Sequence, residues 1–203
     1  MSFARGSIIK KIILIIIFIP IGMVLLYMLY PNVSYLKKNN PEKTSFMKYR
    51  EKEWEKRGEK KIIRQTWVPL SKISPYVTHA VIISEDDKFW QHEGFDFEAI
   101  KDAFTKDLKK KEFKYGGSTI TQQLAKNLYL TPSKNPFRKL KEAVLTWRLE
   151  KTLSKKRIIE LYLNVIEWGD GVFGIEEASK INFRKSASSL EPMEAALLAV
   201  VLP

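Results

Sequence analysis

Apolar side chains recur at the spacing of an α-helix through most of the second half of the chain. Ile120, Leu124 and Leu128 follow one another at intervals of four residues, which places them on one face of a helix. Thr119 stands directly before this stripe and Gln122 three residues after Thr119, the spacing of a capping box. The pattern therefore predicts a helix that begins at Ile120 and buries this stripe.

A second helix is predicted after Asn135, because a capping residue is followed there by Pro136 at the first helical position. Its apolar positions are Leu140, Val144 and Trp147, which we expect to form the buried face of the helix. Arg138, Lys139 and Glu142 cluster near its start.

A third helix is predicted from Ser154, and its apolar residues repeat at the first, fourth, fifth and eighth positions: Ile158, Leu161, Tyr162 and Val165. It should end before a loop with three glycines, Gly169, Gly171 and Gly174. Residues 193–202 predict a last apolar helix, whereas 67–73 is more extended around Pro69. Helical patterns dominate, so the predicted fold class is mainly α.

Residues 12–30 carry no charged side chain. A helix of that length spans about 28 Å, close to the thickness of a bilayer core, so we predict an uncleaved transmembrane anchor. A cleaved signal peptide is the competing interpretation, although no small-residue cleavage site follows the run. Lys10 and Lys11 adjoin the span, which favours residues 1–11 in the cytoplasm and the long C-terminal part outside.

Residues 31–60 are rich in Lys and Arg and contain Pro31 and Pro41 as helix breakers. They predict a connector beside the membrane, which either rests at the level of the headgroups or packs as a linker helix on the domain. The predicted domain covers residues 61–203, about the length of one ordinary domain.

Composition and charge exclude some classes of site. The 203 residues include no cysteine and two histidines, so a thiolate metal site is excluded and any metal should be bound by oxygen. A net charge of +12 and the lysines between 106 and 114 could suit nucleic acid. The predicted anchor argues instead for anionic headgroups and a phosphorylated substrate, with a solvated loop as the alternative, and no nucleic-acid partner is predicted.

Candidate chemistry concentrates in two polar segments. Residues 85–87 join three carboxylates, and residues 116–119 lead into the helix that carries Gln123, Lys126 and Asn127. A carboxylate can take a proton from a sugar hydroxyl while a cation stabilises a phosphorylated leaving group. The two aspartates oppose ionisation of the neighbouring glutamate, as a general base working near neutrality requires, although a solvated acidic loop would look the same. Together the segments predict a sugar-phosphate transferase.

Five blocks between residues 67 and 203 resemble, in order and spacing, those of the peptidoglycan glycosyltransferases, the transglycosylase family that polymerises lipid II. The blocks are Glu85-Asp86 with Phe89, His92 and Gly94; Gly117 to Leu128; Arg138-Lys139 with Glu142, Leu149 and Glu150; Ile159 to Asn164 with Gly169 and Gly174; and Ala195 to Pro203. The connector also resembles the monofunctional branch known from Gram-negative bacteria. Because members of the family continue beyond Leu202-Pro203, the resemblance implies a C-terminally truncated domain.

The resemblance implies a lysozyme-like domain, anchored by one span to the outer, periplasmic face of the cytoplasmic (inner) membrane. The donor would be the growing glycan on undecaprenyl pyrophosphate, and the acceptor the GlcNAc 4-hydroxyl of lipid II. The new bond would be β-1,4, formed with inversion and with release of undecaprenyl pyrophosphate. The implied partners are lipid II, the pyrophosphate-linked glycan, membrane lipids and other proteins of cell-wall synthesis or division.

The same resemblance assigns roles to residues. It makes Glu85 the general base and Glu142 a second carboxylate that stabilises developing charge or holds a divalent cation, Mg²⁺ or Mn²⁺, at the pyrophosphate. A surface ion pair of Glu142 with Arg138, four residues earlier, is the alternative for this carboxylate. The implied substrate-binding residues are Asp86, Ser118, Thr119, Gln123, Lys126, Asn127, Arg138 and Lys139. Phe89, His92 and Gly94 form a structural motif.

Two other functions remain open from the sequence. A membrane-anchored, lysozyme-like hydrolase of glycan strands would need a general acid but not the cationic cluster. A non-catalytic glycan-binding scaffold would have no use for Glu85, Glu142 and Lys126 together.

Overall fold

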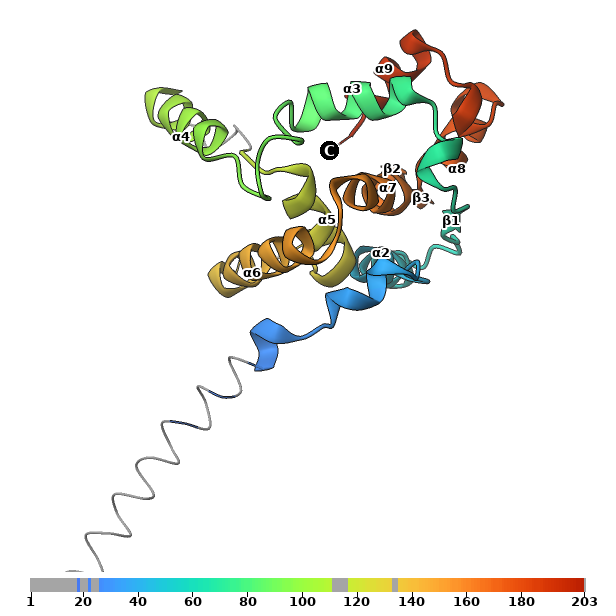
Figure 1. The fold of residues 1–203 in the computed structure, drawn as a ribbon. Coiled ribbons are helices and arrows are strands. Elements are labelled where there is room, and N and C mark those ends of the chain that lie inside the picture. Colours follow the sequence, from blue (N-terminus) through green and yellow to red (C-terminus); the bar gives the residue numbers. More distant parts are fainter. Residues whose placement is uncertain (1–17, 19–21, 23–25, 111–116, 133–134, 203) are drawn as a thin grey trace, which may run out of the picture. The chain divides into compact units, whose positions relative to one another are not determined.

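The computed structural model describes residues 18, 22, 26–110, 117–132 and 135–202. Residues Val33–Pro203 form one compact unit, distinct from Met1–Asn32 (Figure 1). The helices of the larger unit are α2 (Ser45–Lys56), α3 (Pro75–Glu85), α4 (Phe97–Lys110), α5 (Ile120–Tyr129), α6 (Pro136–Thr152), α7 (Lys155–Val165), α8 (Ile175–Phe183) and α9 (Pro192–Val200). Short 3-10 turns cover Val33–Lys37, Leu70–Lys72 and Ala187–Ser189. The predicted mainly helical fold is confirmed, and its lysozyme-like character stays a prediction.

The predicted anchor at 12–30 lies largely outside the described residues, as does the basic run from 111 onward. In the part of the chain that the structure describes, no helix combines the length and the apolar character that crossing a bilayer requires. The domain boundaries at 31–60 and 61–203 stay predictions.

The three predicted helix caps are confirmed. Thr119 accepts a hydrogen bond from the Gln122 N–H, and the Gln122 side chain accepts one from the Thr119 N–H, which completes the capping box of α5. Asn135 caps α6 through the Phe137 N–H, and Ser154 caps α7 through the Arg157 N–H. Each cap supplies an acceptor to N–H groups that have no partner within the helix.

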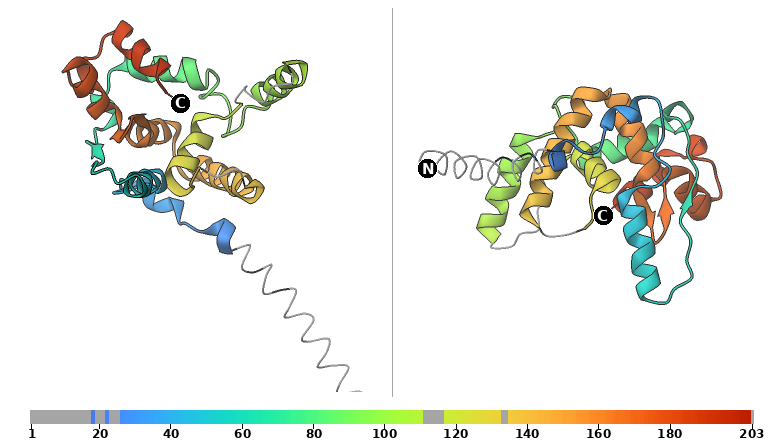
Figure 2. Two further views of the ribbon diagram at one scale, coloured as in Figure 1. Left: turned by 180° about the vertical axis from the view of Figure 1, so that it is seen from behind. Right: turned by 90° about the horizontal axis from the view of Figure 1, so that it is seen from below.

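The core of the unit lies where α5 packs against α6 and α7. The predicted stripe of Ile120, Leu124 and Leu128 is buried, and so is the stripe of α7. Helices α3 and α9 lie side by side, whereas α4 stands apart from the other helices in Figure 1 and in the left view of Figure 2. The loop after α3 contacts the N-terminus of α5 through Asp86 and Gly94.

The buried face predicted for α6 is wrong. Leu140 and Trp147 are exposed, and Val144 is half-buried. The buried face instead contains Lys141, Glu142, Leu145, Thr146 and Leu149. This face contains polar side chains that are satisfied within the protein. Glu142 pairs with Arg138 and Lys139, and the Thr146 hydroxyl donates to the Glu142 carbonyl.

The glycine loop after α7 carries a small sheet instead of an irregular turn. Strands β1 (Arg64–Gln65), β2 (Glu167–Gly169) and β3 (Val172–Phe173) pair in the order β1-β3-β2, with β1 parallel and β2 antiparallel to β3. Trp54 of α2 is buried, and its indole N–H donates to Asp170. Helix α2, predicted as part of the connector, therefore packs on the same compact unit.

Candidate functional site

Glu85 is the last residue of α3, where the helix ends beside the first turn of α5. The Gln123 side-chain N–H donates to Glu85 Oε2 at 2.7 Å. Glu85 also lines a cavity of about 130 Å³ together with Ser118, Thr119 and Asp96. Residues 85–87 and the described part of the second polar segment, 117–119, therefore meet at one cavity.

The neighbouring Asp86 joins the loop after α3 to the start of α5. Its Oδ2 accepts the Ile120 backbone N–H at 2.9 Å, and its Oδ1 lies 2.8 Å from His92 Nε2. Because His92 Nδ1 accepts the Gly94 N–H at 3.0 Å, Nε2 must carry the imidazole proton and donate it to Asp86. Asp86 is buried and bound on both oxygens, so its contacts within the protein hold the loop in place.

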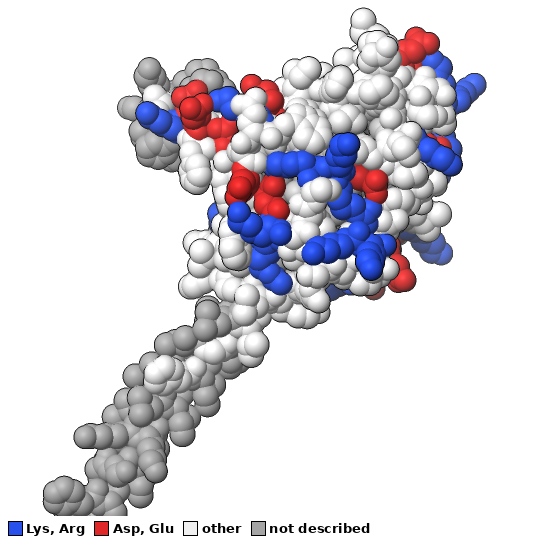
Figure 3. Space-filling model, viewed as in Figure 1, with Lys and Arg blue, Asp and Glu red and all other residues white. Residues whose placement is uncertain are grey.

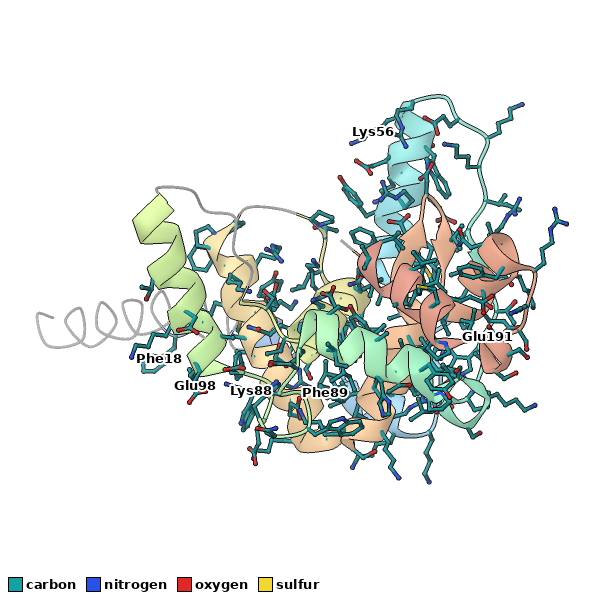
Figure 4. All side chains as sticks on the ribbon, turned by 90° about the horizontal axis from the view of Figure 1, so that it is seen from above. Phe18, Lys56, Lys88, Phe89, Glu98 and Glu191 are labelled. Atoms are coloured by element: carbon teal, nitrogen blue, oxygen red, sulfur yellow. The ribbon has the colours of Figure 1, made fainter. Side chains whose placement is uncertain are left out.

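The loop residues Phe89 and Gly94 also pack tightly. Phe89 is fully buried, and the Lys155 Nζ lies 4.4 Å from the centre of its ring. Lys88, next to it, pairs with Glu98 of α4, as Figure 4 shows. The carbonyl of Gly94 accepts the Thr119 hydroxyl at 2.7 Å, so the loop also braces the capping residue of α5.

Gly94→Ala is expected to destabilise the fold by roughly 2–4 kcal/mol. Gly94 has φ of +92°, and a Cβ there would lie 2.8 Å from Thr146 Cγ2. Gly58→Ala is the matched control, since its φ is +69° but nothing lies within 4 Å of the added Cβ. Urea unfolding of both variants measures the difference, and equal losses would mean that crowding at Thr146 has no effect.

Glu142 forms the second charged group of the site. Its carboxylate is buried and forms one ion pair with Arg138, at 2.9 Å, and another with Lys139. The predicted alternative, an ion pair with Arg138 four residues earlier, is therefore present, but it does not lie at the surface, because the Glu142 side chain is 4% exposed. A buried carboxylate of this kind needs the paired cations to offset its desolvation.

Lys126 of α5 completes the cluster. Burial lowers the pKa of its ammonium group, Arg138 and Lys139 lower it further, and the charges of Glu142 and Glu85 act in the opposite direction. Among the described residues, Lys126 has no hydrogen-bond or ion-pair partner that would use its three donors. The site thus contains a partly dehydrated cation that is free to bind an anion. Figure 3 shows Lys and Arg side chains gathered around a few acidic ones over the middle of the unit.

The remaining predicted substrate-binding residues fall into two groups. Ser118 lines the cavity beside Glu85 and makes no hydrogen bond to another described residue, so its hydroxyl is available. The Thr119 hydroxyl is used in capping α5, and the buried Asn127 donates to the Gln123 carbonyl one turn earlier. These two side chains therefore stabilise α5 through hydrogen bonds to its own backbone.

The residues at Glu142 do not fit a resident divalent cation. Both carboxylate oxygens already bind cationic side chains, and Lys126 adds a third positive charge nearby. No group of three acidic or histidine side chains able to hold a metal occurs among the residues that the structure describes.

Sequence reasoning missed one polar contact of this site. Tyr162 of α7 was predicted as part of an apolar stripe, and it is indeed fully buried. Its hydroxyl, however, donates to Gln123 Oε1 at 2.9 Å, on the side of the amide away from Glu85. The periodic pattern could not reveal this contact, because α5 and α7 are separated by an entire helix in the chain.

Comparison with known proteins identifies the family. The family model described as Transglycosylase matches residues 51–203. The biosynthetic peptidoglycan transglycosylase of Nitrosospira multiformis is 46% identical over 92% of this chain and 81% of its own length. The proteins of the same name from Chromobacterium violaceum and Dechloromonas aromatica are 49% and 51% identical, over 85% and 81% of this chain and 75% and 71% of their own lengths. The chain belongs to the transglycosylase family and is a glycosyltransferase.

Proposed function

We propose that the chain polymerises lipid II into β-1,4-linked glycan strands and releases undecaprenyl pyrophosphate. The observation that carries the proposal is the position of Glu85 at the same cavity as Ser118 and within the electrostatic reach of Lys126. A base and a cluster of cations side by side suit a transfer in which a hydroxyl attacks and a pyrophosphate departs. The names of the relatives, which refer to peptidoglycan, support the same substrate class.

In the proposed reaction, Glu85 takes the proton of the GlcNAc 4-hydroxyl as its oxygen attacks carbon 1 of the donor. The bond between carbon 1 and the pyrophosphate oxygen breaks as the new bond forms on the opposite face of the sugar. The configuration at carbon 1 is therefore inverted. The open oxygen of Glu85 is Oε1, since Oε2 accepts from Gln123.

The leaving pyrophosphate gains negative charge as its bond to the sugar breaks. Lys126, Arg138 and Lys139 are the cations proposed to bind it, and Glu142 holds Arg138 and Lys139 in place through its two ion pairs. Hydrogen bonds from charged donors to a phosphate are stronger than those from neutral ones, and partial burial strengthens them further. No step of this scheme is assigned to a divalent cation.

The proposal places the domain at the cytoplasmic membrane, because lipid II carries its sugars on a membrane-bound lipid. It places the domain on the periplasmic face, because Lys10 and Lys11 adjoin the predicted span on its other side. It extends to membrane lipids and to other proteins of wall synthesis or division as partners. Reconstitution of the full chain into vesicles with protease added outside would report the side on which residues 33–202 lie.

Incubation of the chain with labelled lipid II, and separately with finished peptidoglycan, tests the proposed activity. Growth of long strands from lipid II is the expected result. Shortening of finished strands would favour the hydrolase, which has no obvious use for the three cations. Binding without a change in either substrate would favour the scaffold.

A further inference from the structure

Tyr162 is a buried hydroxyl beside the site that the proposed reaction does not use. It lies on α7 and is fully buried, and among the described residues its hydroxyl makes one hydrogen bond, to Gln123 Oε1. Burial, and then the nearby charges of Glu85 and Asp86, raise the pKa of its hydroxyl well above the ordinary value. Tyr162 therefore keeps its proton throughout the range in which the enzyme works, and it remains a hydrogen-bond donor.

The Gln123 side chain links this hydroxyl to Glu85. A primary amide has an oxygen that accepts hydrogen bonds and a nitrogen that donates them. The neighbour of the Gln123 oxygen must therefore be a donor, and the neighbour of its nitrogen must be an acceptor. Here the oxygen accepts a hydrogen bond from the Tyr162 hydroxyl at 2.9 Å, and the nitrogen donates one to Glu85 Oε2 at 2.7 Å. The reversed amide would point lone pairs at an ionised carboxylate, which is repulsive.

We propose that Tyr162 is a positioning residue that acts through Gln123 to hold the Glu85 carboxylate in the orientation required of the base. The chain of two hydrogen bonds joins α7, α5 and α3. The base at the end of α3 is therefore held by side chains of α5 and α7. It engages Oε2 and leaves Oε1 toward the incoming hydroxyl. This inference rests on the proposed function for its catalytic consequence.

The proposal assigns Tyr162 no contact with substrate, since its side chain is fully buried. Removing its hydroxyl should therefore lower kcat and leave KM for lipid II unchanged. Loss of one hydrogen bond from a chain that ends on a charged group corresponds to about a 10-fold fall in rate. Such an effect must pass through Gln123 and cannot persist when that side chain is absent.

A double-mutant cycle of Tyr162→Phe and Gln123→Leu separates this role from a structural one. We expect Tyr162→Phe to lower kcat about 10-fold in the wild-type background and less than about 2-fold in the Gln123→Leu background. Tyr129→Phe is the matched control, because burial raises the pKa of that tyrosine to about 12 and its hydroxyl makes no hydrogen bond to another described residue. It should leave kcat unchanged.

Side-chain amide signals of Gln123, observed by ¹⁵N NMR in the full chain, give a readout that needs no substrate. They should shift in Tyr162→Phe and stay in place in Tyr129→Phe. Unchanged Gln123 signals in Tyr162→Phe would overturn the inference whatever the activity of the chain. Equal losses of kcat in the two backgrounds, in a wild-type enzyme that polymerises lipid II, would overturn it while leaving the proposed function intact.

Discussion

Glu85→Gln is expected to slow lipid II polymerisation by about 100-fold or more, the usual contribution of a positioned general base. The amide has the shape of the carboxylate but cannot accept the proton of an attacking hydroxyl. The amide oxygen of the variant can still accept the hydrogen bond that the Gln123 side chain donates to Glu85 Oε2 in the wild type. Folding should therefore be unaffected, and steady-state kinetics together with circular dichroism would show a loss of rate in an intact protein.

Glu93→Gln provides the matched control for this variant. It makes the same chemical change in the loop that follows α3, but the Glu93 side chain is 77% exposed and pairs with Lys151 at the surface. An exposed pair of this kind contributes about 0–1 kcal/mol, so the control should keep its activity and nearly all of its stability. Full activity in Glu85→Gln would contradict the assignment of Glu85 as the general base.

Lys126→Met is expected to lower kcat/KM by about 100-fold or more while raising the melting temperature. The lysine should bind the pyrophosphate both before and during bond breaking, so kcat falls and KM rises. Its charge is unfavourable in the folded state without substrate, because burial and the neighbouring cations lower its pKa. Methionine keeps much of the side-chain volume and removes that charge, and each kcal/mol gained corresponds to about 2–4 °C in a domain of this size.

The pH dependence of this gain in stability follows from the direction of the pKa shift. A lysine whose pKa is lower in the folded state than the ordinary 10.5 is costly while both states are protonated, and the cost disappears as pH rises from the lowered value to 10.5. The difference in melting temperature between variant and wild type should therefore be largest near neutral pH and shrink in the alkaline range.

Lys151→Met is the control for the lysine variant, since it removes the same charge from an exposed position on α6. It should change neither kcat/KM nor the melting temperature appreciably. If Lys126→Met were less stable than the wild type and equally active, Lys126 would instead be a packing residue of α5.

The sequence was sufficient for those parts of the fold that local patterns determine. The caps at Thr119, Asn135 and Ser154 could be predicted because each depends on residues within one turn of the helix start. The buried stripe of α5 followed from its spacing. The cationic and acidic residues of the site could be selected from the resemblance of short blocks to the family.

The errors arose where packing between distant segments decides the outcome. On α6, the apolar residues Leu140 and Trp147 are exposed, whereas the polar residues Glu142 and Thr146 lie on the buried face beside Leu145 and Leu149. The pairing of Asp86 with the N-terminus of α5 joins residues 34 positions apart, so no local pattern indicates it. The contact of Tyr162 with Gln123 depends in the same way on how α7 packs against α5.

The pH dependence of kcat/KM for lipid II, measured in parallel for the wild type and Glu85→Gln, tests most directly the claim that Glu85 accepts the proton. The account predicts that wild-type activity falls on the acid side as the carboxylate becomes protonated, and that the small residual rate of the variant lacks this fall. An identical acid-side fall in both proteins would contradict it, since another group would then be the base.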